Sequence, residues 1–188
     1  MLAHIRTTGN GDFSIQRLSA AYDNDLVNQL GNLVNRTLKL ISLYARSRVP
    51  ILGEPDAHDR QLLHSALSLS KAVAVAVDEY RLNHAVSEIW QLVHDANRYV
   101  SDIKPWKLAA CPNGTAGSEH TNRLDNCLHV LATVLVTIAL SLRPFLPSTA
   151  ANILRAFRSV EPASTTSTLP AVGGNTIREI GLLFPKNR

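Results

Sequence analysis

The sequence has few of the features that mark a disulfide-stabilised domain, a secreted protein or a membrane span. It contains only two cysteines, Cys111 and Cys127, and they do not form a CxxC pair. A disulfide framework or a zinc knuckle is therefore not expected, and the pattern fits a reducing cytoplasm. The first thirteen residues lack the apolar segment of a secretory signal. The one long uncharged run, Asn126 to Leu142, is shorter than the roughly 20 apolar residues that cross a bilayer, so we interpret it as a buried core helix.

Motifs that carry catalysis are also missing. The sequence contains no HExxH, no Walker P-loop, no GxSxG and no dinucleotide-binding glycine pattern. Its seven histidines are scattered without metal-ligand spacing, and no pair of carboxylates stands out for acid–base chemistry. We therefore expect no cofactor, no bound metal and no catalytic residue in this chain.

What the sequence does have is the composition of a basic globular protein. Hydrophobic residues make up 45% and charged residues 18% of the 188 residues, and the formal net charge is +4. Such a chain can form one domain with a hydrophobic core. The positive charge fits a polyanionic partner but does not require one.

Helical periodicity dominates the chain and predicts an all-α fold. One helix is expected from about Asp25 to Arg46, because apolar residues recur there every three or four positions: Val27, Leu30, Val34, Leu38, Ile41 and Ala45. Similar patterns predict helices near residues 14–22, 57–80, 84–103, 122–142 and 147–158, with Asp56 as the N-cap of the helix from 57. Their short connections predict an antiparallel helical bundle.

Three further segments are predicted to lie outside these helices. Residues 111–121 have the composition of a loop, and residues 161–175 that of a mobile linker. The apolar residues of the C-terminal tail are expected to dock back on the bundle: Ile180, Leu182, Leu183 and Phe184.

A polar face on the helix from Asp25 is the first cluster that could carry function. On a helical wheel its members lie away from the apolar stripe: Asn28, Asn32, Asn35 and Arg36. Asparagine and glycine are poor helix formers, and such local conflicts tend to mark functional or tightly packed sites. Asn32 and Arg36 stand side by side at i and i+4 and could together contact the edge of a nucleobase. A plain solvent-exposed face, with Gly31 allowing close helix contact, explains the same pattern.

The second cluster follows a predicted helix end at Pro105. Trp106 lies beside Lys104 and Lys107, and an exposed aromatic ring next to basic residues suits stacking on an unpaired base. A tryptophan that only covers the end of the core is the alternative. Asn97 falls on an apolar stripe and is expected to tie two elements together by hydrogen bonds, whereas Tyr99 lies on another face.

Five short stretches, spread over nearly the whole chain, decide between these alternatives. They are GDFS (residues 11–14), YDNDLVNQLGNLVNR (22–36), ANRYVSDIKPWKLA (96–109), LRPFLPSTAANI (142–153) and GLLFP (181–185). In sequence and in order they resemble the anticodon-binding domain of methionyl-tRNA synthetases, members of the class I aminoacyl-tRNA synthetase family. The pieces around the LGNL and PW motifs are specific for the methionyl branch, and the leucine-rich helices between them are not.

The resemblance implies a helical bundle that binds the CAU anticodon loop of tRNA(Met). It implies that Trp106 stacks on an anticodon base, while Asn32 and Arg36 hydrogen-bond to base edges. Asn97, Tyr99 and Pro105 would hold that surface in place, with Asn28 and Asn35 beside it. The chain would be the anticodon-binding part of a methionine–tRNA ligase or a stand-alone paralogue.

The chain also departs from that family. The family's catalytic domain, with its HIGH and KMSKS motifs, precedes the GDFS stretch, whereas residues 1–12 resemble only the end of that connecting region. We therefore expect that the chain alone does not activate methionine, and a separate catalytic subunit is a partner left open. Ala110 stands where the family often has lysine. We divide the chain into this remnant, a helical domain at 13–158, and a linker and tail at 159–188.

A helical protein-interaction or regulatory module that has lost tRNA binding is the alternative function. The absence of the catalytic domain motivates it, because apolar surface that the family covers would then be free to bind another protein.

Overall fold

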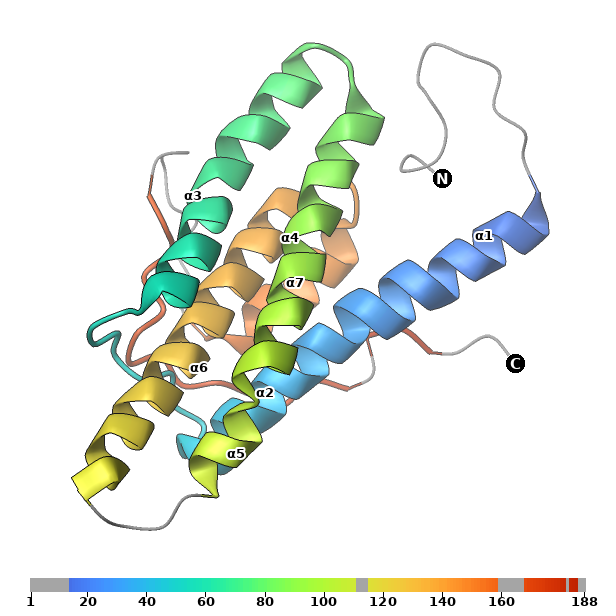
Figure 1. The fold of residues 1–188 in the computed structure, drawn as a ribbon. Helices are drawn as coiled ribbons and strands as arrows, with labels where there is room; N and C mark the ends of the chain where they lie inside the picture. The colour runs from blue at the N-terminus through green and yellow to red at the C-terminus, as the bar shows by residue number, and fades with distance from the viewer. Residues whose placement is uncertain (1–13, 111–114, 159–167, 182, 186–188) are drawn as a thin grey trace.

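The computed structural model describes residues 14–110, 115–158, 168–181 and 183–185. These residues form the predicted all-α bundle, and the described part contains no strand beyond an isolated antiparallel bridge between Arg48 and Thr176. The helices are α1 (Ile15–Ala21), the π-helix η1 (Tyr22–Gly31), α2 (Asn32–Tyr44), α3 (Ala57–Asp78), α4 (Leu82–Ile103), α5 (Pro105–Ala109), α6 (Thr115–Leu142) and α7 (Pro147–Ala156). In Figure 1, α3 and α4 form an antiparallel hairpin, α6 lies beside it, and α1, η1 and α2 form one long rod that crosses the bundle.

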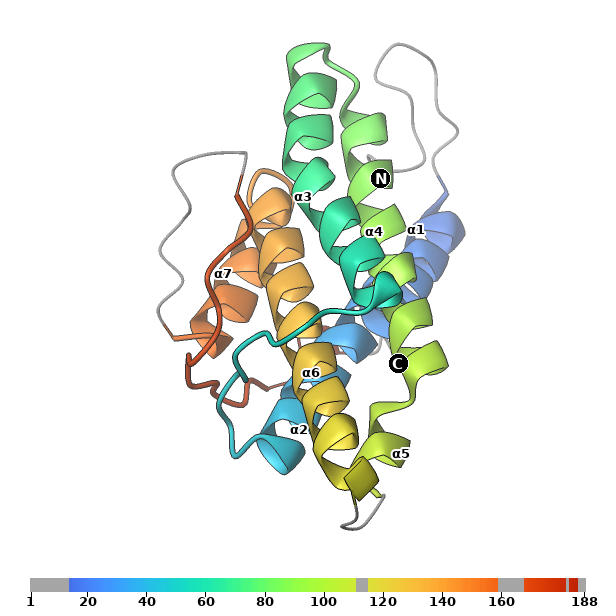
Figure 2. The ribbon, with the colours of Figure 1, turned by 60° about the vertical axis from the view of Figure 1, so that its left-hand side comes forward.

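The core is built around α6, which Figure 2 shows between α3, α7 and α2. Nearly every side chain from Asn126 to Leu142 is buried, including Leu128, Leu131, Leu135 and Ile138. The segment Thr121–Leu142 is long and apolar enough to cross a membrane, but 83% of its most apolar window is buried inside the protein. The prediction of a core helix is therefore confirmed.

The first departure from the predicted elements is that the two N-terminal helices are continuous. Ala21 and Tyr22 both have right-handed helical dihedral angles, so no break occurs at Asp23 and Asn24. Instead the chain widens into a ten-residue π-helix. Its core-facing residues are Tyr22, then Leu26 and Val27, then Leu30 and Gly31, so the pattern recurs every four to five positions. Packing of this face overrides the weak helix propensity of its Asp and Asn residues.

The second departure is at the start of α6. The helix begins at Thr115, so the loop prediction for 111–121 is wrong from that residue onward, and residues 111–114 lie outside the described part. Adding turns to an existing helix costs little, because only nucleation is unfavourable. The buried half of α6 therefore supports an amino-terminal extension that the loop-like composition did not indicate.

The third departure concerns the predicted mobile linker. Residues 168–175 dock on the bundle: Val172 is completely buried, Gly174 N donates to Val49 O at 2.8 Å, and Val49 N donates to Asn175 O at 2.9 Å. The linker prediction is wrong for these residues, and 159–167 lie outside the described part. Docking of the tail is confirmed by the buried Phe184 and the partly buried Ile180 and Leu183, while Leu182 is not described.

Candidate nucleic-acid interface

The polar face predicted on the long helix is present and faces solvent. Asn28, Asn32 and Asn35 are exposed and Arg36 is half-buried, while Leu30, Val34 and Leu38 on the other side are buried. The Asn32 side-chain nitrogen donates to the Asn28 carbonyl oxygen at 2.8 Å. Asn28 therefore acts through its backbone and fixes the rotamer of the Asn32 amide.

Trp106 projects from the short helix α5, at the end of α4. The chain reverses at Lys104, which has left-handed dihedral angles (φ 52°, ψ 63°), and the buried Pro105 then occupies the first position of α5. Proline suits this position because its fixed φ is helical and its missing N–H would be unpaired there. Pro105 thus ends one helix, as predicted, and opens another. Trp106 is 40% exposed.

The fold brings the two predicted clusters together. The guanidinium carbon of Arg36 lies 5.6 Å from the centroid of the Trp106 ring, within the range of a cation–π contact. The sequence predicted both residues as site candidates but not this contact. Neither α2 nor α5 contains an acidic residue, whereas Lys39, Lys104 and Lys107 are exposed on or beside them. The charged side chains of α2 and α5 are therefore all positive.

Asn97 has the tying role that its place on an apolar stripe predicted. Its side-chain nitrogen donates to Val93 O at 3.0 Å and, with longer bonds of 3.3 Å each, to the backbone and side-chain oxygens of Gln29. Because Gln29 belongs to η1, the amide links the end of α4 to the helix that carries Asn28 and Asn32.

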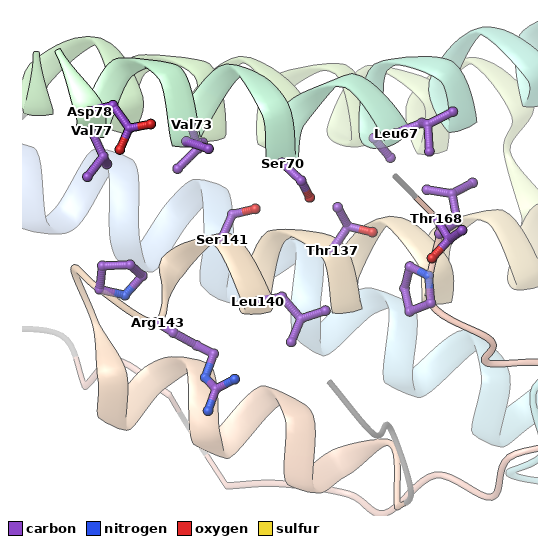
Figure 3. A pocket seen from close by; sticks show the side chains of 15 residues that line it. Leu67, Ser70, Val73, Val77, Asp78, Thr137, Leu140, Ser141, Arg143 and Thr168 are labelled. Carbon is purple, nitrogen blue, oxygen red and sulfur yellow. The ribbon is translucent and has the colours of Figure 1, made fainter. Parts of the chain in front are cut away.

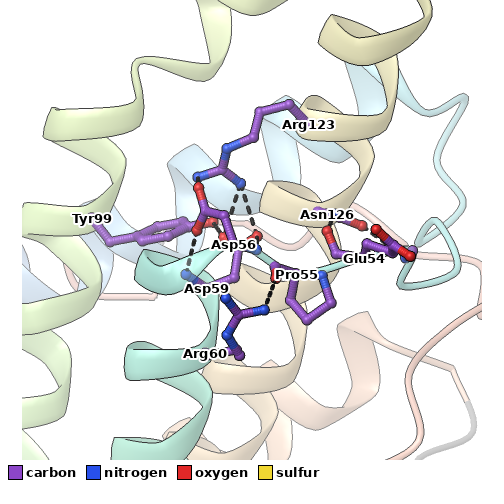
Figure 4. A network of polar contacts seen from close by, with 9 residues as sticks. Glu54, Pro55, Asp56, Asp59, Arg60, Tyr99, Arg123 and Asn126 are labelled. Atoms are coloured by element: carbon purple, nitrogen blue, oxygen red, sulfur yellow. Dashed lines mark hydrogen bonds and ion pairs between the residues drawn. The ribbon is translucent and has the colours of Figure 1, made fainter.

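Tyr99 is buried on another face of α4, and its hydroxyl donates to the carboxylate of Asp59 (Figure 4). Burial raises the pKa of Tyr99 above its ordinary value, with a further contribution from Asp59. Arg123 donates to both oxygens of the same carboxylate, at 2.9 and 3.0 Å, and its other terminal nitrogen lies 3.0 Å from Asp56.

The Asp59–Arg123 pair is the part of this region that the sequence analysis missed. One signal was available, because Asp56 was predicted as an N-cap and Asp59 stands three residues later. Asp56 and Asp59 form a capping box, in which each side chain accepts the backbone N–H of the other. No local pattern indicates Arg123, which reaches Asp59 from a helix 64 residues away in the sequence.

The described residues offer little for catalysis. They contain no cluster of three or more metal-ligating side chains. Burial raises the pKa of the Cys127 thiol to about 12, so this cysteine is not a nucleophile at neutral pH. A groove of about 450 Å³ opens between α3 and the end of α6 (Figure 3), but its described lining is mostly apolar or hydroxyl-bearing and includes neither histidine nor cysteine.

Comparisons with known proteins identify the family of the chain. A family model described as the anticodon-binding domain of tRNA ligase matches residues 59–172, a range that includes Trp106 but begins after Asn32 and Arg36. The methionine–tRNA ligase of Caldanaerobacter subterraneus is 29% identical over 99% of this chain, which corresponds to 29% of that protein. The methionine–tRNA ligase of Nocardioides sp. is 35% identical over 78% of this chain and 23% of its own length.

Solved structures agree with these sequence relatives. The free methionyl-tRNA synthetase of Mycobacterium tuberculosis superposes on all of this chain and 37% of its own, with a TM-score of 0.90 and 26% identity. Its complex with methionyl-adenylate gives a TM-score of 0.88 at 26% identity, over 98% of this chain and 36% of its own. The present chain spans less than a third of the length of the curated relatives it matches.

Proposed function

Because this chain belongs to the anticodon-binding domain family of tRNA ligases, we propose that it binds the CAU anticodon loop of a methionine tRNA. It would do so as the anticodon-binding part of a methionine–tRNA ligase or as a stand-alone paralogue. A cytoplasmic location goes with this proposal. So does a catalytic partner, in the same chain or in a separate subunit, which would supply aminoacylation.

The observation that carries the proposal is the contact between Arg36 and the exposed ring of Trp106. Proteins that recognise RNA by sequence mostly bind single-stranded loops, where unstacked bases lie on aromatic rings or guanidinium planes. A base stacked on Trp106 would lie close to both Arg36 and Asn32, since these two residues are one helical turn apart. Their side chains supply the donors and the acceptor that a base edge requires.

The Asn32 side chain is held in one orientation by a hydrogen bond within its own helix. One of its N–H groups is held by Asn28 O, and among the described residues neither its side-chain oxygen nor its second N–H has another partner. An amide fixed through one donor presents the remaining donor and acceptor side by side. This geometry supports hydrogen bonding to a base edge better than a freely rotating side chain would.

The proposal is tested by binding to an anticodon stem-loop that carries CAU, compared with one whose loop is permuted, at one near-physiological salt concentration. Salt must be constant because phosphate contacts alone give an affinity that falls steeply with ionic strength. We expect a clear preference for CAU. Equal affinity for the two loops would refute anticodon recognition and leave a basic helical bundle.

The residue that should carry most of this preference is Trp106. Trp106→Ala should cost about 1–3 kcal/mol of binding free energy if one base stacks on the ring. The matched control is Tyr80→Ala, which removes an exposed aromatic ring at the α3–α4 turn, at the other end of α4. Equal effects of the two substitutions would contradict a stacking role for Trp106.

The alternative of a protein-interaction module that has lost tRNA binding is not favoured. Loss of RNA binding would remove the need for Asn32, Arg36 and Trp106 to stay together. All three are retained, and the fold places Arg36 against Trp106.

A further inference from the structure

Asp59 is a carboxylate with no exposed surface at the start of α3, and several donors surround it (Figure 4). It accepts hydrogen bonds from the Tyr99 hydroxyl, from the Asp56 N–H at 3.1 Å and from Arg123 at 2.9 and 3.0 Å. Its place in the first turn of α3 adds the favourable field of a helix amino terminus. The charge is therefore paired and fully hydrogen-bonded, as a buried charge must be.

This network joins three helices near the end of α4. Asp59 belongs to α3, Arg123 to α6 and Tyr99 to α4. The guanidinium carbon of Arg123 also lies 6.0 Å from the centroid of the Tyr99 ring, so both the hydroxyl and the ring of Tyr99 have partners in the network. A buried ion pair adds little net stability compared with apolar packing, but its hydrogen bonds weaken steeply when donor and acceptor are misaligned. Its effect is thus to fix where α4 lies against α3 and α6.

The last turns of α4 are bonded both to η1 and to the Asp59–Arg123 network. Asn97 ties the helix to Gln29 of η1, and Tyr99, two residues later, ties it to Asp59 and Arg123. After Ile103 the backbone has little freedom, because Lys104 adopts the left-handed conformation and Pro105 is buried with a fixed φ. The position of Trp106 opposite Arg36 therefore follows from the position of the end of α4.

We propose that Asp59 and Arg123 are positioning residues for Trp106, acting through Tyr99. They touch no RNA in this proposal. They hold the end of α4 so that the Trp106 ring stands opposite Arg36 before a loop binds. The part of the proposal that concerns affinity rests on the proposed anticodon binding, whereas the part that concerns the placement of Trp106 does not.

The test uses Tyr99→Phe, which keeps the ring and deletes only the hydroxyl that reaches Asp59. The first measurement is the indole N–H signal of Trp106 in a ¹H–¹⁵N spectrum of the free protein, assigned with Trp90→Phe, since Trp90 is the other tryptophan. We expect this signal to shift or broaden. The second measurement is affinity for the CAU stem-loop, which should fall about threefold to tenfold, because a displaced ring keeps only part of its stacking free energy.

Thr137→Val is the matched control. It also deletes a buried hydroxyl, one that donates to Thr133 O at 2.9 Å within α6, on a side chain that lines the groove facing α3. We expect the control to leave the Trp106 signal and the loop affinity unchanged. Asp59→Asn is the second variant: it keeps the shape and removes the charge, and it should move the Trp106 signal in the same way as Tyr99→Phe.

The outcomes separate the two proposals. An unchanged Trp106 signal in both Tyr99→Phe and Asp59→Asn would overturn the positioning role, and so would an equal shift in Thr137→Val. A Trp106 signal that moves, in a protein that binds the CAU and permuted loops equally, would support positioning and refute anticodon binding.

Discussion

The ring of Phe184 occupies the space that a side chain on Gly31 would need. A Cβ atom at Gly31 would stand 3.3 Å from Cδ2 of Phe184. The same ring meets Tyr22 edge-on, with 6.2 Å between centroids, and the Tyr22 hydroxyl donates to Pro185 O at 2.9 Å. The C-terminal tail is thus anchored on η1, immediately before the residue Asn32 that is proposed to contact RNA.

We therefore expect Gly31→Leu and Phe184→Ala to be strongly non-additive. Phe184→Ala should lower the free energy of unfolding by about 3 kcal/mol, the usual cost of truncating a buried phenylalanine. Gly31→Leu should cost a similar amount in the wild type, because the leucine must expel the ring. In the Phe184→Ala background the ring is gone and only the Leu26 carbonyl oxygen, 3.2 Å from the same Cβ position, still crowds the site, so Gly31→Leu should cost less.

Urea denaturation of the four proteins gives this comparison as a double-mutant cycle. Additive costs would show that the tail does not pack on Gly31 in solution. The control cycle combines Gly31→Leu with Leu63→Ala. Leu63 belongs to α3, and none of its atoms is among the nearest neighbours of Gly31, so the two costs should add.

The sequence predicted the fold class and most of this site, for identifiable reasons. The stripe from Leu30 to Leu38 repeats at helical spacing, so the exposed face with Asn32 and Arg36 followed from periodicity alone. Asn97 was recognisable because an amide on an apolar stripe needs hydrogen-bond partners. Such inferences depend only on residues close together in the sequence.

What the sequence did not predict depends on residues far apart. Arg36 and Trp106 meet because η1 and α4 cross, and Arg123 reaches Asp59 because α6 lies beside α3. The π-helix and the docking of Val172 likewise arise from tertiary packing that overrides local propensity. Segments 111–121 and 161–175 both have the composition of loops. In the first, residues from Thr115 onward extend α6, and in the second, residues 168–175 pack on the bundle. Neither outcome can be predicted from composition.

Arg36 should not be replaceable by lysine. Lys keeps the charge but lacks the planar guanidinium that faces the Trp106 ring and offers paired donors. We expect Arg36→Lys to lose most of the preference for the CAU loop while keeping the salt dependence of binding, because the number of positive charges is unchanged.

The measurement is the dissociation constant for CAU and permuted stem-loops across several salt concentrations. Arg143→Lys, an exposed arginine at the end of α6, is the control and should have no effect. If Arg36→Lys bound both loops as the wild type does, Arg36 would act as a point charge on phosphate rather than on a base.

Asp56 should contribute to stability mainly as a helix cap. Asp56→Ala removes the acceptor for Asp59 N at 2.8 Å and the ion pair with Arg123, and should cost about 1–2 kcal/mol. Asp56→Ser keeps a capping oxygen but not the charge. We expect it to recover about half or more of the loss in a urea denaturation experiment. Equal costs for the two variants would instead assign the contribution of Asp56 to its charge.

The stability of the protein should fall at alkaline pH. Burial raises the pKa of Cys127 from an ordinary 9.0 to about 12, and it raises the pKa of Tyr99 as well. The Cys127 thiol and the Tyr99 hydroxyl are neutral below their folded pKa values. Both ionise at a lower pH in the unfolded chain than in the folded protein. The contribution of Cys127 is therefore fully present below its unfolded pKa of about 9, and it is lost as the pH rises toward the folded value of about 12.

For Cys127 this loss is at most about 4 kcal/mol, at 1.36 kcal/mol per pKa unit. The free energy of unfolding, measured in urea with a reducing agent between pH 7 and pH 11, should decrease from about pH 9 upward. Deprotonation of lysines changes the stability of the wild type and of a Cys127 variant equally. The informative quantity is therefore the difference between their free energies of unfolding. Cys127→Ala should be less stable than the wild type at pH 7, and the gap should narrow as the pH rises. If the wild-type and Cys127→Ala free energies of unfolding stayed a constant distance apart across this pH range, the thiol would not be shielded from water as fully as its burial implies.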